Sequence, residues 1–187
     1  AYGALYLCDG TAVGADPQEC KNVGDLIVYL GLDRYATNGD AQGGFWILKN
    51  PIAGFAQFGD DLKLVDEDGA ILQHSDGDFL VQVDIINGGS NFEIRLYEWI
   101  GEGPAGSLSA PVPLGVGQFC DVAGVPIDAC GAINDCEACE AKWPYTNASP
   151  QWTPGTLPAG ALFEARFNLT ELGVVDGLVC SLGFIAE

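Results

Sequence analysis

The chain is poor in basic residues, has a single histidine and contains no methionine. Seven Lys and Arg stand against 26 Asp and Glu, which gives a formal net charge of −19. Such a negative surface repels nucleic-acid backbones and anionic lipid, so we expect neither as a partner. No apolar run approaches the roughly 18 residues of a membrane-spanning helix, so membrane insertion is not expected either.

The residues that common catalytic mechanisms need are also scarce. His74, the only histidine, lies in the polar turn LQHSDGD, which indicates a surface position. Neighbours in sequence do not form a Ser-His-Asp triad, and the nucleophile-elbow pattern G-x-S-x-G is absent. The acidic residues offer many carboxylate pairs of the kind that glycosidases use, but the sequence marks none as buried. We therefore predict that the chain is not an enzyme.

The length and the ends of the chain bear on its organisation. At 187 residues it can enclose one sizeable core, so we expect a single domain over residues 1–187. It begins at Ala1, and both ends lie within apolar runs, AYGALYL and LVCSLGFIAE. We expect a segment of a longer secreted polypeptide.

Alternation of apolar and polar residues runs through most of the chain and predicts strands separated by Gly- and Pro-rich turns. The Gly-rich turn NGGSN at residues 87–91 predicts a hairpin between two of these strands. Only Ile133–Lys142, INDCEACEAK, has a helical pattern, with Asp135 as a candidate cap. The predicted class is an all-β, antiparallel β-sandwich, jelly-roll-like, with one short helix. The predicted strands are Ala1–Cys8, Asp25–Leu32, Gly43–Lys49, Leu62–Val65, Phe79–Ile86, Phe92–Ile100, Ala161–Leu169 and Gly177–Ile185.

The stretch Leu26–Leu48, LIVYLGLDRYATNGDAQGGFWIL, is the most distinctive in the chain. It resembles a module of large secreted bacterial surface proteins, in which a strand, then D-R-Y-x-x-N-G-D, then G-F-W-F recurs. In that family the module usually precedes immunoglobulin-like or SpaA-like repeats. The resemblance implies an extracellular or cell-surface location, and it brings no catalytic residues with it.

Seven cysteines in an acidic chain indicate an oxidising compartment and disulfide bonds. Cys8 and Cys20 flank one loop and are the easiest pair to propose. The pair Cys136-x-x-Cys139 also fits a zinc site or a redox motif, although a zinc ribbon uses a second such pair. The odd number leaves one thiol free or bonded to another chain. The candidate disulfide cysteines are Cys8, Cys20, Cys120, Cys130, Cys136, Cys139 and Cys180.

Two acidic regions are candidate calcium sites, because Ca²⁺ prefers oxygen ligands on a tightly turning chain. The first is the loop of Asp33, Asn38 and Asp40; a simple turn, with Asp33 paired to Arg34, explains the same residues. The second is a pair of acidic turns that a hairpin would bring together around an ion. The alternative is that both turns are solvated and bind no metal. The candidate ligands of this second site are Asp66, Asp68, Asp76 and Asp78.

Aromatic residues suggest a second kind of site. Trp46 and Trp99 lie in predicted strands, which favours core positions. Trp143, Tyr145 and Trp152 lie in or beside a loop, where exposed rings can stack on sugars. We predict a non-catalytic structural or adhesive module that associates with itself or with other surface proteins. The alternative is a calcium-dependent carbohydrate-binding module that binds glycans. A repeating subunit of a surface fibre or sheath would fit the first hypothesis.

Overall fold

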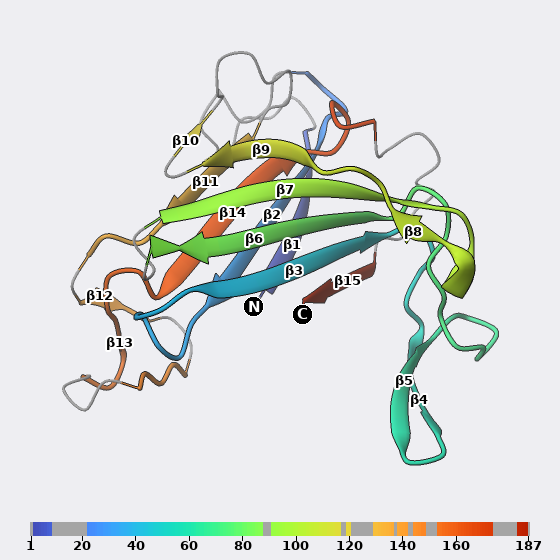
Figure 1. Cartoon of the computed structure of the whole chain (residues 1–187), viewed down its shortest axis with the longest axis horizontal. Helices are drawn as coiled ribbons and strands as arrows, with labels where there is room; N and C mark the ends of the chain where they lie inside the picture. Colours follow the sequence, from blue (N-terminus) through green and yellow to red (C-terminus); the bar gives the residue numbers. More distant parts are fainter. Residues whose placement is uncertain are drawn as a thin grey trace.

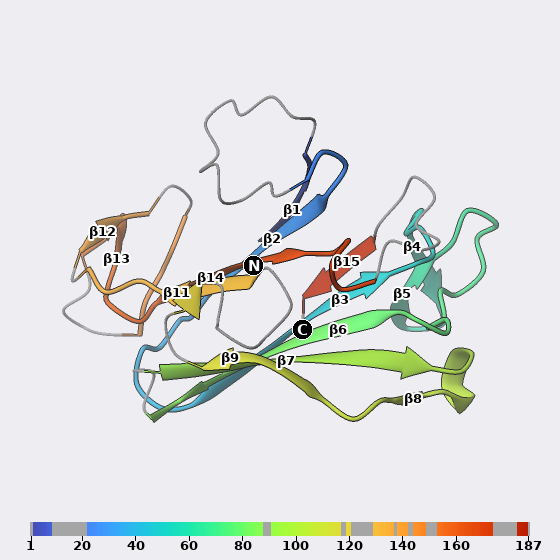
Figure 2. The same cartoon turned by 90° about the horizontal axis from the view of Figure 1, so that it is seen from above.

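The computed structural model of the chain describes residues 2–8, 22–87, 91–116, 119–120, 129–136, 138–141, 144–148, 153–173 and 183–186. Two antiparallel sheets dominate these residues (Figures 1 and 2). The first sheet has the strand order β1 (Tyr2–Leu7), β2 (Leu26–Asp33), β14 (Leu162–Asn168), β11 (Ala129–Ile133) and β10 (Phe119–Cys120). The second has the order β15 (Gly183–Ala186), β3 (Ala41–Leu48), β6 (Phe79–Ile86) and β7 (Asn91–Ile100), with β8 (Ser107–Leu108) and β9 (Val112–Val116) both paired to β7.

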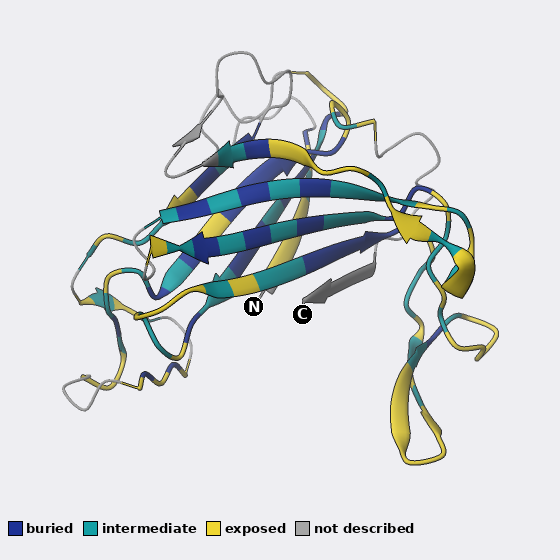
Figure 3. Cartoon of the chain, in the orientation of Figure 1, coloured by how far each residue is buried: buried dark blue, intermediate teal, exposed yellow. Residues whose placement is uncertain are grey.

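Strands β6 and β7 show how the alternating pattern places side chains. They pair antiparallel on either side of the predicted turn, with Ile86 opposite Asn91. The buried residues of the two strands face the core: Val81, Val83, Ile85, Phe92, Ile94 and Leu96. Asp84, Glu93 and Arg95 lie on the other face, where Arg95 forms ion pairs with both acids. The alternation of buried and half-buried residues along both strands is visible in Figure 3.

The core lies between the two sheets and takes residues from both. Phe92 of β7 meets Phe163 of β14 edge to face, with ring centroids 5.0 Å apart. Both side chains are almost fully buried, as are Val28 of β2 and Ile47 of β3 in the same cluster. Burial of this apolar surface is the main contribution that holds the two sheets together.

The all-β, antiparallel class predicted from the sequence is confirmed. The structure also gives the order of the strands, which the sequence did not predict. β3, β6, β7 and β9 follow one another as neighbours in one sheet, which is a meander. A jelly roll is instead built from two Greek keys, so the observed order differs from the jelly-roll arrangement that we expected.

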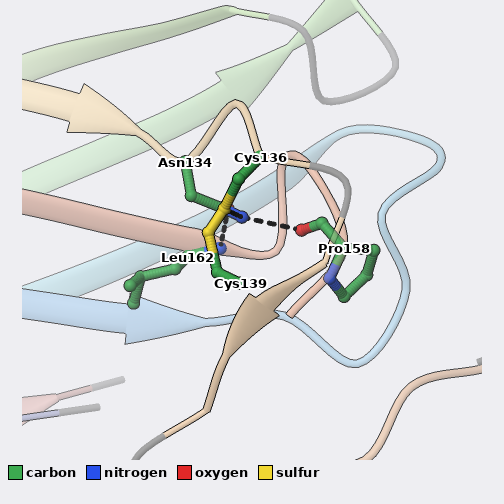
Figure 4. Close-up of a disulfide and its surroundings, with 5 residues drawn as sticks. All are labelled: Asn134, Cys136, Cys139, Pro158 and Leu162. Atoms are coloured by element: carbon green, nitrogen blue, oxygen red, sulfur yellow. Dashed lines mark hydrogen bonds between the residues drawn. A yellow bond between two sulfur atoms is a disulfide. The ribbon is translucent and has the colours of Figure 1, made fainter. Parts of the chain in front are cut away.

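The helix expected over Ile133–Lys142 is wrong. Ile133 ends β11, and Cys139–Glu140 form β12, which pairs with β13 (Thr156–Leu157). Asn134 explains the difference, because its side chain accepts a hydrogen bond from Leu162 N (2.7 Å) and donates one to Pro158 O (2.9 Å) (Figure 4). These contacts with a distant segment, and the Cys136–Cys139 disulfide, hold the segment in a non-helical loop.

A hairpin stands away from the two sheets. Strands β4 (Gly54–Phe58) and β5 (Asp61–Val65) pair only with each other in the described part of the chain, apart from one bridge between Val65 and Ile71. Figure 1 shows the hairpin projecting from the end of the sheets, and Figure 3 shows that it is largely exposed. None of the described segments forms a helix with the length and apolar character needed to cross a membrane.

Candidate functional site

The loop between β2 and β3 holds the first candidate calcium ligands and a buried arginine. Arg34 is 6% exposed; its backbone N–H donates to Ala161 O (2.8 Å), and Nη1 donates to Gly39 O (3.4 Å). Its Nε and Nη2 are buried without a hydrogen-bond partner. Desolvation lowers the pKa of this guanidinium, and charge interactions with Tyr145 and Asp40 oppose the lowering.

This arrangement bears directly on calcium binding. The positive charge of Arg34 already lies close enough to Asp40 to interact with it, so a divalent cation bound there would be repelled by the guanidinium. Asp33, at the end of β2, and Asn38, in the turn, belong to the same loop. Calcium at this loop stays a prediction, and Arg34 is the residue that opposes it.

Three of the four acidic residues of the second candidate calcium site, Asp66, Asp76 and Asp78, accept hydrogen bonds from backbone N–H groups. Asp66 Oδ1 accepts from the N–H groups of Asp68 (3.0 Å) and Ala70 (2.9 Å). Asp76 Oδ1 accepts from Gly101 N (2.7 Å). Within the described residues, no group of three or more His, Cys, Asp or Glu side chains is arranged to hold a metal ion.

The loop aromatics predicted to bind sugar are placed only in part. Tyr145 is buried, and its hydroxyl donates to Arg34 O (2.6 Å) and accepts from Asn147 Nδ2 (2.7 Å). Its ring packs with Leu157 and therefore does not offer the exposed stacking face that we expected. Trp143 and Trp152 lie outside the described residues.

Sequence reasoning missed a cluster of three rings that comes from three separate segments. His74 lies with its ring centroid 4.0 Å from that of Trp46 and 4.8 Å from that of Trp99. Trp46 is buried, as predicted, but His74 is partly covered rather than free on the surface. The only local signal was an aspartate four residues after the histidine.

That aspartate, Asp78, fixes the position of the histidine. It is 1% exposed, and its Oδ2 lies 3.3 Å from His74 Nδ1. The carboxylate also accepts from Lys49 N (2.8 Å) and Ser75 N (3.0 Å). Because Nδ1 faces Asp78, Nε2 is the ring nitrogen left to bond a ligand.

A pocket of about 150 Å³ opens beside this cluster. Gly103 N donates to His74 O (2.7 Å), which holds the Gly103–Ala105 turn against the histidine segment. Gly106 packs so closely on Trp99 that a Cβ there would lie 2.2 Å from Nε1, so the position requires glycine. Among the described residues, the lining is mostly apolar, and Gln73 and His74 supply its polar side chains. The lining residues are Leu48, Leu64, Leu72, Gln73, His74, Trp99, Gly103 and Pro104.

The cysteines are oxidised where the structure describes their side chains. Cys136 bonds to Cys139, and Cys8 and Cys130 are also disulfide-bonded. The β10–β11 register places Cys120 directly opposite Cys130. The predicted Cys20 and Cys180 lie outside the described residues.

Comparisons of the chain with protein-family models, with curated proteins and with solved structures found no match.

Proposed function

We propose that the chain is a non-catalytic structural or adhesive module of an extracellular assembly, and that it joins a neighbouring chain by strand addition at β1. The observation that carries this proposal is the state of the β1 edge. β1 pairs with β2 on one side, and no described strand pairs with its other side. Strand addition at such an edge satisfies the free backbone groups of both partners.

The hydrogen bonds around β1 identify which of its backbone groups face away from β2. Cys8 N donates to Asp25 O (2.8 Å), so this pair is a hydrogen-bonded pair of the antiparallel ladder. Bonding alternates along such a ladder, so Tyr6 directs its backbone groups toward β2. Leu5 and Leu7 direct theirs to the open edge.

The side chains of the same strand also support a missing partner. Leu5 lies opposite Val28, which is fully buried in the core, so both side chains lie on the inner face of the sheet. Leu5 is nevertheless 43% exposed and Leu7 is 59% exposed. These two inner-face side chains are therefore only partly covered, and covering them further would contribute about 1 kcal/mol each.

The charge distribution of β1 favours pairing with another strand and does not block it. Exposed edges usually carry lysine, proline or a bulge that blocks association. Residues 2–7, YGALYL, carry no charge and no proline, although the chain as a whole has a net charge of −19. An uncharged edge is where two such chains can approach with the least repulsion.

Two further observations support the class of function. Disulfides persist in oxidising compartments, which agrees with an extracellular location. The pocket beside His74 is lined mainly by apolar side chains, which suits the docking of a partner. A fibre or sheath subunit and a module that pairs with a different surface protein are two forms of this proposal.

Proline substitutions at adjacent positions test the proposal. Leu5→Pro removes an N–H that faces the open edge, whereas the matched control Tyr6→Pro removes one that bonds β2. We expect the purified chain to form oligomers that resist dilution, seen by light scattering and electron microscopy. Leu5→Pro should give folded monomers, and Tyr6→Pro should instead lower the melting temperature.

A second variant keeps the test independent of proline strain. Leu5→Lys leaves the backbone of β1 intact and places a charge beside the edge, so it should also give folded monomers. Assembly that survives in both folded Leu5 variants would refute strand addition at β1. A native chain that stays monomeric at high concentration would refute the assembly function.

A further inference from the structure

We infer that the β4–β5 hairpin and the adjacent pocket form a second docking surface, which binds a cationic polypeptide segment through one apolar anchor residue. This surface, called the hairpin–pocket surface, consists of Phe55, Leu62, Leu64, Leu72, Trp99 and Pro104. It is separate from the β1 edge, and it adds a specific partner class to the proposed module.

The β4–β5 hairpin exposes large apolar side chains to water, which is unfavourable. Phe55 is 68% exposed and Leu62 is 63% exposed. A two-stranded hairpin without further packing is only marginally stable, and exposed apolar patches commonly mark interaction sites. A partner packed on these side chains would bury them and stabilise the hairpin.

The strand register joins the exposed hairpin face to the pocket. Phe55 lies opposite Leu64, and Gln57 lies opposite Leu62. Opposed residues and residues two apart share a face, so Phe55, Leu62 and Leu64 lie on the same face. Leu64 also lines the pocket, and Leu72 N bonds to Leu64 O (2.9 Å), so the apolar face continues into the pocket.

The pocket has the size and the chemistry for one side chain of a peptide. Its volume of about 150 Å³ is smaller than the roughly 300–1,000 Å³ of sites for whole small molecules. Three leucines and Trp99 supply the apolar lining. The Gln73 amide and the His74 ring, held by Asp78, provide polar groups that can bond the backbone of a bound peptide.

The surrounding charge specifies a basic partner. Exposed acids flank both ends of the surface: Asp60 and Asp61 at the hairpin turn, and Asp76 and Glu102 beside the pocket. Lys63 pairs with Asp61 (3.1 Å) and offsets that charge, and Lys49 Nζ donates to Asp76 O (2.9 Å). With Asp60, Asp76 and Glu102 all exposed, the acids still outnumber these two lysines. At this surface, unlike the uncharged β1 edge, an acidic partner would meet exposed acids, so a cationic polypeptide is the complementary occupant.

Synthetic peptides and the full chain test this inference. The probe is a short lysine-rich peptide with one central leucine or phenylalanine, and its binding is followed by tryptophan fluorescence and calorimetry. The comparison peptides carry serine in place of the anchor, or glutamate in place of lysine. We expect binding only when the anchor and the positive charges are both present, and weaker binding as salt rises.

Variants locate the binding surface. Phe55→Ser with Leu62→Ser should weaken binding by about tenfold or more, because exposed anchors are lost without disturbing the core. The matched control, Val112→Ser, changes an apolar residue of β9 that is 48% exposed and should leave affinity unchanged. Leu5→Lys should also leave it unchanged, which separates this surface from assembly at β1.

Three results would overturn the inference. The role of an apolar anchor residue would be excluded if the serine peptide bound as tightly as the leucine peptide. The location would be excluded if the hairpin variants bound normally. The partner class would be excluded if a panel of neutral glycans bound to this surface and the cationic peptides did not.

Discussion

Replacing Asp78 with alanine should destabilise the protein far more than the same change at Asp76. The Asp78 carboxylate is 1% exposed and accepts hydrogen bonds from Lys49 N and Ser75 N, at 2.8 and 3.0 Å. It thereby joins the end of β3 to the turn that carries His74. Asp76 is exposed, and Gly101 N donates to its Oδ1 (2.7 Å).

The size of the effect follows from the donors that lose their acceptor. Each buried polar group left unsatisfied costs about 1–3 kcal/mol, so two backbone N–H groups cost about 2–6 kcal/mol. For a domain of this size, 1 kcal/mol lowers the melting temperature by about 2–4 °C, so we expect a decrease of roughly 4–24 °C. The change at Asp76 removes an exposed hydrogen bond, worth about 1 kcal/mol.

Thermal and urea unfolding of both variants, followed by circular dichroism, measures the difference. Asp78→Asn is a useful third variant, because it keeps the volume but directs an amide N–H₂ at a backbone donor. Its loss of stability should approach that of Asp78→Ala. The fluorescence of Trp46 and Trp99 should change in both Asp78 variants, because His74 loses the group that positions it.

Comparing the Asp78 and Asp76 variants tests whether the buried hydrogen bonds of Asp78 stabilise the fold. If Asp78→Ala and Asp76→Ala unfold at the same temperature, the buried hydrogen bonds of Asp78 do not stabilise the fold. If stability falls but the tryptophan fluorescence is unchanged, Asp78 is not what positions His74.

The remaining predictions concern the cysteines and calcium. The unfolded, unreduced chain should contain about one free thiol or none, and several free thiols would contradict the disulfide prediction. Peptide mapping without reduction should find Cys136 bonded to Cys139 and Cys120 bonded to Cys130. Calcium at a hundredfold excess over Kd should raise the melting temperature by about 6–12 °C. Asp40→Asn should abolish that shift and Arg34→Met should enlarge it; an equal shift with sodium, or an intact shift in Asp40→Asn, would exclude the loop site.

The strands could be predicted from the sequence because their pattern is local. In β6 and β7, alternate apolar residues and a Gly-rich turn between them specify a hairpin with one buried face. The hairpin β4–β5 was predicted only as its second strand, because the alternation of Gly54–Phe58 is short and its side chains are largely exposed. The helix prediction at Ile133–Lys142 failed because Asn134 bonds to a segment more than twenty residues away, which a local pattern does not contain.

By itself, the sequence determined the all-β class, most of the strand positions, the acidic surface and the oxidised cysteines. These depend on composition and on spacing between near neighbours. Only the tertiary structure decided that His74 stacks with Trp46 and Trp99, that Arg34 is buried in a candidate calcium loop, and that Leu5 and Leu7 of β1 are left partly exposed. Each of these depends on which distant strands become neighbours, because register and packing of whole sheets decide which side chains are covered.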